Sequence, residues 1–121
     1  MRIALDSSVL IAAHISRAGV CAELLEDLLL HHELVTSEFI LEELERKLLE
    51  KFSFPKREVG QVAAFLRRAA LVVVPANMGT AVGGDCALLV SVDRDLLDMQ
   101  RINEIPIIRP GEYWRRTTNV S

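Results

Sequence analysis

The N-terminal segment, residues 1–11, reads MRIALDSSVLI and combines a short apolar run with an abrupt polar stop. The run Ile3-Ala4-Leu5 is apolar at every position, which is typical of a strand that is buried on both faces of a parallel sheet. Asp6 ends the run, and Ser7 and Ser8 can cap a helix over residues 9–15. This order of strand, acid and helix predicts an α/β fold with a carboxylate at the end of its first strand.

The remainder of the chain repeats the alternation. Helical periodicity covers residues 20–31, 39–49 after the capping Ser37, 55–66 with Pro55 as the first residue, 93–99 and 110–116. Short apolar runs cover residues 34–36, 71–74, 88–92 and 106–108. Near-continuous apolar strands separated by helices predict a parallel sheet with helices on both faces. We therefore expect one domain over residues 1–121, built as a three-layer α/β/α sandwich.

One connection is unusually short. The run at 71–74 ends at Pro75, and the next strand starts at Leu88. A parallel crossover normally takes about a dozen residues, usually including a helix. Here the interval contains Gly79, Gly83 and Gly84 and is a poor helix former. We expect the crossover over residues 75–83 to be shortened or incomplete.

Composition excludes several classes of protein. The 121 residues carry 14 Lys and Arg against 17 Asp and Glu, a net charge of −3, so bulk positive charge cannot be what holds a nucleic acid. Two cysteines form neither a disulfide framework nor a CxxC metal motif. The apolar stretches are too short to span a bilayer, and Asp6 interrupts what would be a secretory signal. We expect a cytoplasmic protein without a membrane partner.

Two of the predicted strands end in acids. Asp6 follows the first run, and Asp93 follows the run at 88–92, with Asp95 two residues further on. In open parallel sheets, ligands bind beyond the carboxyl ends of the strands, where the strand order reverses. Each aspartate taken alone could serve only as a helix cap. Several acids at one edge of a sheet are harder to explain in that way.

The helix at 39–49 adds a third acid. Its periodicity places Glu43 towards Phe39 and Ile40, on the more buried side. Two carboxylates about 4 Å apart repel by roughly 4 kcal/mol at an effective dielectric constant near 20, so a cluster of acids requires a cation or raised pKa values. Oxygen ligands without His or Cys favour Mg²⁺ or Mn²⁺. The other acids of this helix share its outer face and are Glu38, Glu42 and Glu45.

Four segments, in order along the chain, resemble motifs of PIN domains. Residues 3–11, IALDSSVLI, resemble the opening "LDTNVL" of that family, and residues 36–44, TSEFILEEL, resemble its "SxxILxEL" helix. Residues 89–97, LVSVDRDLL, resemble "LVTGDxDLL", and residues 105–114, IPIIRPGEYW, resemble the closing "IPIxxPxEFW". The resemblance is greatest to small bacterial PIN proteins related to VapC, the toxins of toxin–antitoxin pairs.

The resemblance implies a metal-dependent endoribonuclease with a parallel α/β/α fold. Position by position, it implies that Asp6, Glu43 and Asp93 hold Mg²⁺ or Mn²⁺, with Asp95 as an adjacent catalytic acid. It also implies RNA as substrate, a cognate antitoxin as protein partner, and homodimers, which are common in the family. The small polar residues that the family has around its metal site, near the substrate, correspond to Ser7, Ser8 and Ser91.

The sequence departs from the family pattern in one serious respect. PIN domains carry a third acid in a "DPxDxxxLGTAV"-like stretch, and residues 77–82, NMGTAV, rejoin that pattern without the acidic part. Three explanations stay open: a loop left out of the sequence, a deletion, or a degenerate member of the family. Two other functions therefore stay open. One is a catalytically silent PIN scaffold that binds RNA or a protein, and the other is an aspartyl phosphatase, although Ser8 stands where that class needs a second Asp.

Other features allow two interpretations each. The basic residues Arg46, Lys47, Lys51, Arg67 and Arg68 could guide an RNA backbone or form solvated helix faces. Tyr113 and Trp114 could stack on bases or pack the last helix on the sheet. The leucine-rich helix at 20–31 could form a dimer face or belong to the core.

Overall fold

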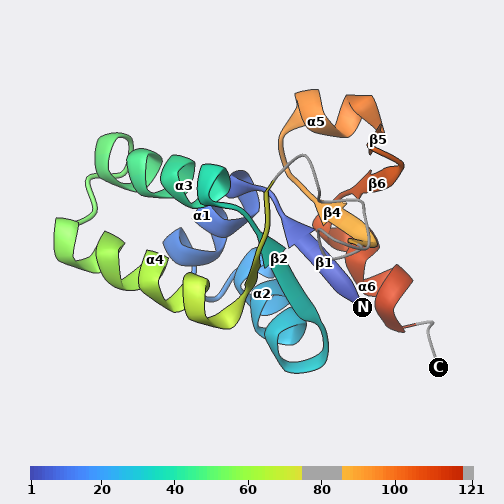
Figure 1. Cartoon of the computed structure of the whole chain (residues 1–121), viewed down its shortest axis with the longest axis horizontal. Coiled ribbons are helices and arrows are strands. Elements are labelled where there is room, and N and C mark those ends of the chain that lie inside the picture. Colours follow the sequence, from blue (N-terminus) through green and yellow to red (C-terminus); the bar gives the residue numbers. More distant parts are fainter. Residues whose placement is uncertain (75–85, 119–121) are drawn as a thin grey trace.

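The computed structural model describes residues 1–74 and 86–118. These residues form an α/β fold with six helices and a six-stranded mixed sheet (Figure 1). The predicted alternation of strands and helices is confirmed. The predicted shortening of the crossover at 75–83 falls outside the described residues.

The sheet is parallel except at one edge. In the order β3-β2-β1-β4-β6-β5, its strands are β3 (Leu71–Val72), β2 (Glu33–Thr36), β1 (Arg2–Leu5), β4 (Leu88–Val90), β6 (Ile105–Ile108) and β5 (Arg101–Ile102). Strands β1 to β4 and β6 run parallel to their neighbours, whereas β5 pairs with β6 in the antiparallel direction, so the prediction of a wholly parallel sheet is wrong at this edge. The strands predicted at 71–74 and 88–92 are also shorter than expected and end at Val72 and Val90.

The antiparallel edge is a hairpin that periodicity could not show. A strand of two residues is too short for an alternating pattern, and the turn between β5 and β6 contains neither Gly nor Pro. Asn103 and Glu104 take φ angles of 49° and 69°, and Ile102 pairs with Ile105 across them. A two-residue turn with both φ angles positive has the twist that hairpins favour. Asn adopts this conformation readily, but Glu does not.

The helices begin close to the predicted positions, with three adjustments at their starts. Asp6, rather than Ser7 or Ser8, caps the first helix, Pro55 precedes its helix instead of opening it, and Asp93 caps its helix. Ser37 caps as expected, because its hydroxyl accepts a hydrogen bond from the Ile40 amide at 3.2 Å. The helices are α1 (Ser7–Ile15), α2 (Val20–His31), α3 (Glu38–Glu50), α4 (Lys56–Ala69), α5 (Arg94–Met99) and α6 (Pro110–Thr118).

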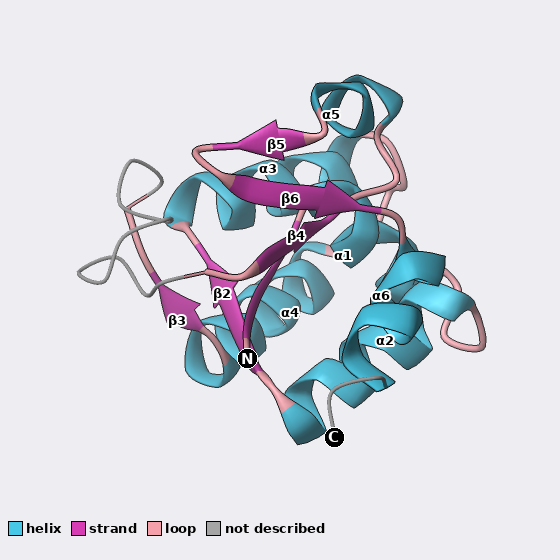
Figure 2. Ribbon diagram, turned by 90° about the vertical axis from the view of Figure 1, so that its right-hand side faces the viewer, coloured by secondary structure: helices cyan, strands magenta, loops and turns pink. Residues whose placement is uncertain are grey.

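Alternate residues of the strands enter two separate apolar clusters. Ile3 and Leu5 of β1 belong to the larger one, which takes residues from α1, α2, α3, α4 and α6. Ala4, between them, belongs to a smaller cluster with residues of β2, β4 and β6, against which α5 packs. Figure 2 shows α5 and β5 apart from α2, α4 and α6. The period of two along a strand explains why one apolar run serves both clusters.

Tyr113 links α6 to α2 through a buried side chain and one hydrogen bond. Its side chain is fully buried, and its hydroxyl donates a 2.7 Å hydrogen bond to the Asp27 carboxylate. Trp114 is half-buried and meets the Tyr113 ring edge to face, with centroids 5.1 Å apart. The packing interpretation of Tyr113 is therefore confirmed, because a fully buried ring is closed to bases. In α2, Leu24, Leu25 and Leu28 are core residues.

Among the described residues, no single helix is long and apolar enough to cross a membrane. Helices α1 and α2 pass that test only when they are joined, and the chain bends by 109° between them.

The Tyr113–Asp27 hydrogen bond should contribute to stability. We expect Tyr113→Phe to lower the free energy of unfolding by about 2 kcal/mol, because a buried bond to a charged acceptor is lost without a cavity being formed. Urea unfolding at neutral pH measures the change. As a control, Asp27→Asn keeps an acceptor oxygen and should cost less. A Tyr113→Phe variant as stable as the parent protein would contradict this role.

The same tyrosine should make stability depend on alkaline pH. Burial, and then the bond to Asp27, raises the pKa of Tyr113 well above its usual range. Above pH of about 10 the unfolded chain therefore releases a proton that the folded chain keeps, and stability falls by up to about 1.4 kcal/mol per pH unit. We expect this fall to be smaller in Tyr113→Phe. Burial also raises the pKa values of Cys21 and Cys86, but both proteins share these groups, so their difference reports Tyr113.

Candidate active site

The order of the strands brings two of the predicted acids together. The chain passes from β1 to β2 and β3 on one side, and then returns to place β4 on the other side of β1. The order therefore reverses between β1 and β4, which is where open α/β sheets bind ligands. Asp6 directly follows β1, and Ser91 and Asp93 follow β4. The backbone joins the two ends, because the Asp6 amide donates to the Val90 carbonyl at 2.9 Å.

A network of hydroxyl groups holds the Asp6 carboxylate. The Ser8 hydroxyl donates to its Oδ2 at 2.7 Å, and the Ser91 hydroxyl donates to the same oxygen at 3.1 Å. The Ser91 hydroxyl also accepts from the Asp93 amide at 2.9 Å, and the Ser8 hydroxyl accepts from the Val92 amide at 3.3 Å. Within the described residues, the hydrogen bonds to the Asp6 carboxylate all end on Oδ2 and none on Oδ1. The Asp6 carboxylate is thus held through one oxygen, with the other left for a ligand.

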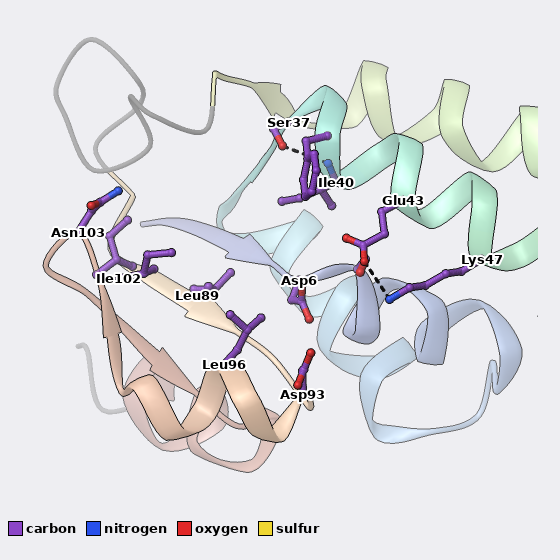
Figure 3. A pocket seen from close by; sticks show the side chains of 13 residues that line it. Asp6, Ser37, Ile40, Glu43, Lys47, Leu89, Asp93, Leu96, Ile102 and Asn103 are labelled. Atoms are coloured by element: carbon purple, nitrogen blue, oxygen red, sulfur yellow. Dashed lines mark hydrogen bonds and ion pairs between the residues drawn. The ribbon is translucent and has the colours of Figure 1, made fainter.

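Both aspartates also cap helices. The Asp6 carboxylate accepts from the Ser8 amide at 3.4 Å, and the Asp93 carboxylate accepts from the Asp95 amide at 2.9 Å. Each aspartate therefore does serve as a helix cap. Capping does not explain why Asp6 and Asp93 face each other at the point where the strand order reverses (Figure 3).

Glu43 comes from α3 and is the half-buried acid that the periodicity predicts. Its side chain is 27% exposed, and it forms an ion pair of 2.9 Å with Lys47 one turn later. Two outward acids of the same helix, Glu38 and Glu45, instead pair with Arg67 of α4 at 2.7 and 3.4 Å. The hydrogen bond from Arg67 lowers the pKa of Glu38. Arg67 therefore joins α3 to α4 through its two carboxylate partners.

Three acids from separate segments line one pocket of about 390 Å³: Asp6, Glu43 and Asp93 (Figure 3). Ser7 is buried and lines the same pocket, whereas Ser8 and Ser91 support Asp6 from outside the lining. Asp95 is exposed and does not line it. The structure therefore brings together the three residues that the resemblance assigns to the metal and leaves the fourth acid outside.

The rest of the pocket was not anticipated. Lys47 reaches into it, and the signal for this was available, because a residue four positions after Glu43 lies on the same side of the helix. Asn103 comes from the hairpin turn, which the sequence did not reveal. The apolar wall comes from α3, β4, α5, β5 and β6 and consists of Phe39, Ile40, Leu89, Leu96, Ile102 and Ile105.

The chemistry of the donors fits a hard divalent cation. The three acids supply carboxylate oxygens, and no His or Cys lines the pocket among the described residues. As their side chains stand, no three His, Cys, Asp or Glu residues within 1–74 and 86–118 are close enough to hold one ion together. Glu43 is instead engaged by Lys47. Binding of an ion through Oε1 of Glu43 would therefore require that oxygen to exchange its ammonium partner for the metal.

Neither a family model nor a curated protein matches the chain.

The Ser91 hydroxyl should stabilise the fold as well as the site. It is fully buried and bridges Asp6 to the Asp93 amide, so Ser91→Ala removes one hydrogen bond from a charged acceptor, which keeps its bonds from Ser8, and leaves a backbone donor without its partner. We expect the free energy of unfolding to fall by about 2 kcal/mol. Ser16→Ala, on the exposed end of α1, is the matched control and should change it by less than about 0.5 kcal/mol. Equal effects of the two variants in urea unfolding would refute the role of Ser91.

Proposed function

We propose that this protein is a metal-dependent endoribonuclease of the PIN type. One observation carries the proposal: carboxylates that follow β1, lie within α3 and follow β4 meet in a single pocket at the reversal of the strand order. Glu43 and Asp93 are 50 positions apart in the chain, so local sequence cannot account for their place in one pocket. Three of the four motif resemblances contain these residues, one acid in each.

A bound Mg²⁺ or Mn²⁺ would supply an activated water molecule and neutralise charge on an RNA phosphate. Asp6, Glu43 and Asp93 are the residues that would hold it. Ser8 and Ser91 orient Asp6 by donating to its Oδ2, and Oδ1 is the oxygen that would bind the ion. Ser7 is buried beside Asp6 and lines the same end of the pocket.

The remaining features of the proposal follow from the resemblance. The described strands and helices are compatible with the three-layer arrangement of PIN domains. In this chain, α5 packs against the smaller apolar cluster, and α1, α2, α3, α4 and α6 contribute to the larger one. RNA is the proposed substrate, a cognate antitoxin the proposed partner, and the cytoplasm the proposed location. Two copies of the chain would form the homodimer that is common in the family.

One observation favours a second function, a PIN scaffold that binds RNA or a protein without cleaving it. In the described part of the chain, the acids do not surround a single ion position as they stand. A site that never closes around an ion would bind without catalysis.

Cleavage of RNA with matched carboxamide variants tests the proposal. We expect wild-type protein to cleave single-stranded RNA internally with Mn²⁺ and to lose cleavage in EDTA. Asp6→Asn and Glu43→Gln should each lower the rate by about 100-fold or more, since a ligand charge is removed at nearly constant shape. Glu42→Gln changes an exposed neighbour on the same helix and should leave the rate within about twofold, as surface changes usually do.

The outcomes separate the candidates. Cleavage that persists in EDTA, or in Asp6→Asn, would refute the assignment of the metal ligands. Binding of RNA or of a protein without any cleavage in Mn²⁺ would establish the silent scaffold. Hydrolysis of a phosphomonoester together with failure to cut RNA would instead support the aspartyl phosphatase.

A further inference from the structure

Lys47 is the only cationic side chain that lines the pocket among the described residues. Its Nζ lies 2.9 Å from Oε1 of Glu43, and its side chain is only 25% exposed. The remaining charged residues of the lining are the three acids themselves. A partly buried ammonium group thus already occupies one of the oxygens that a metal ion would use.

The position of Lys47 follows from the helix rather than from chance contact. Glu43 and Lys47 are one turn apart on α3, with the acid on the N-terminal side, which is the more favourable order for such a pair. Burial of the adjacent Leu44 and Leu48 fixes the rotation of α3 against the core. Packing of α3 therefore turns both groups of the pair into the pocket together.

Charge balance suggests how many cations the pocket can take. Three carboxylates and one ammonium group give the described lining a net charge of −2, which a single divalent ion neutralises. A second divalent ion would leave an excess of positive charge beside Lys47. Without Lys47 the lining would carry −3, and the attraction for a cation would increase.

We propose that Lys47 is a built-in counter-cation that holds Glu43 until a divalent ion displaces it, and that it restricts the site to one ion. The inference rests on the proposed function and extends it to the affinity and stoichiometry of metal binding. Lys47 acts through Glu43 and is a positioning residue, and it opposes binding of the metal that the carboxylates attract.

Titration with Mn²⁺, followed by calorimetry and by the loss of the free-ion EPR signal, tests the proposal without RNA. Wild-type protein should bind one Mn²⁺, and Lys47→Met should bind its first Mn²⁺ about tenfold more tightly, because a positive charge near the ion is removed. Lys47→Arg keeps the charge and should stay close to the wild-type affinity. Arg46→Met removes an exposed charge from the position just before Lys47, outside the pocket lining. It should leave the affinity for Mn²⁺ within about twofold of wild type.

Folding of each variant is checked by its thermal unfolding in EDTA. Two Mn²⁺ ions bound to wild-type protein, or a Lys47→Met affinity no greater than that of wild type, would overturn the inference while metal-dependent cleavage still supports the proposed function. Wild-type protein that binds no Mn²⁺ and cuts no RNA would overturn both. An equal gain in affinity in Arg46→Met would also overturn the inference, because it would show a general effect of net charge.

Discussion

The hydrogen bonds between the Asp6 carboxylate and the hydroxyl groups of Ser8 and Ser91 join the two halves of the sheet where they diverge. Ser8 and Asp6 belong to the first strand–helix unit, and Ser91 lies 85 residues later, after β4. Burial of a carboxylate lowers the stability of the fold unless its oxygens are hydrogen-bonded, so these bonds offset the partial burial of Asp6. They hold the ends of β1 and β4 in register, and the pocket is built on that register.

The pocket concentrates negative charge where the fold gains little from it. Structural stability comes mainly from the larger apolar cluster, in which strands meet α1, α2, α3, α4 and α6. The acids contribute two helix caps and one ion pair, which a less charged set of residues could also supply. Acids that repel one another and that packing does not need are most readily explained by a role in binding a ligand. The pairing of Glu43 with Lys47 reduces the cost while no cation is bound.

Whether an element could be predicted from the sequence depended on the length of its pattern. The strands around Ile3, Leu34 and Leu88 and the inward side of α3 were predictable, because apolar periodicity reports burial directly. The β5–β6 hairpin was not, since its first strand has two residues and its turn uses Asn103 and Glu104 with positive φ angles in place of glycine. The helix starts were misjudged by a residue or two, because Asp6, Ser7 and Ser8 are all competent caps and only backbone geometry chooses among them.

The sequence by itself determined the alternation of strands and helices, the acids at two strand ends, and the inward position of Glu43, because each depends on spacing within a few residues. Only the tertiary structure decided that Asp6, Glu43 and Asp93 share a pocket, that Asp95 lies outside it, and that Lys47 already engages Glu43. The physical reason is that strand order and helix docking depend on contacts between residues far apart in the chain. No local pattern encodes those contacts, and the chemistry of the pocket depends on them.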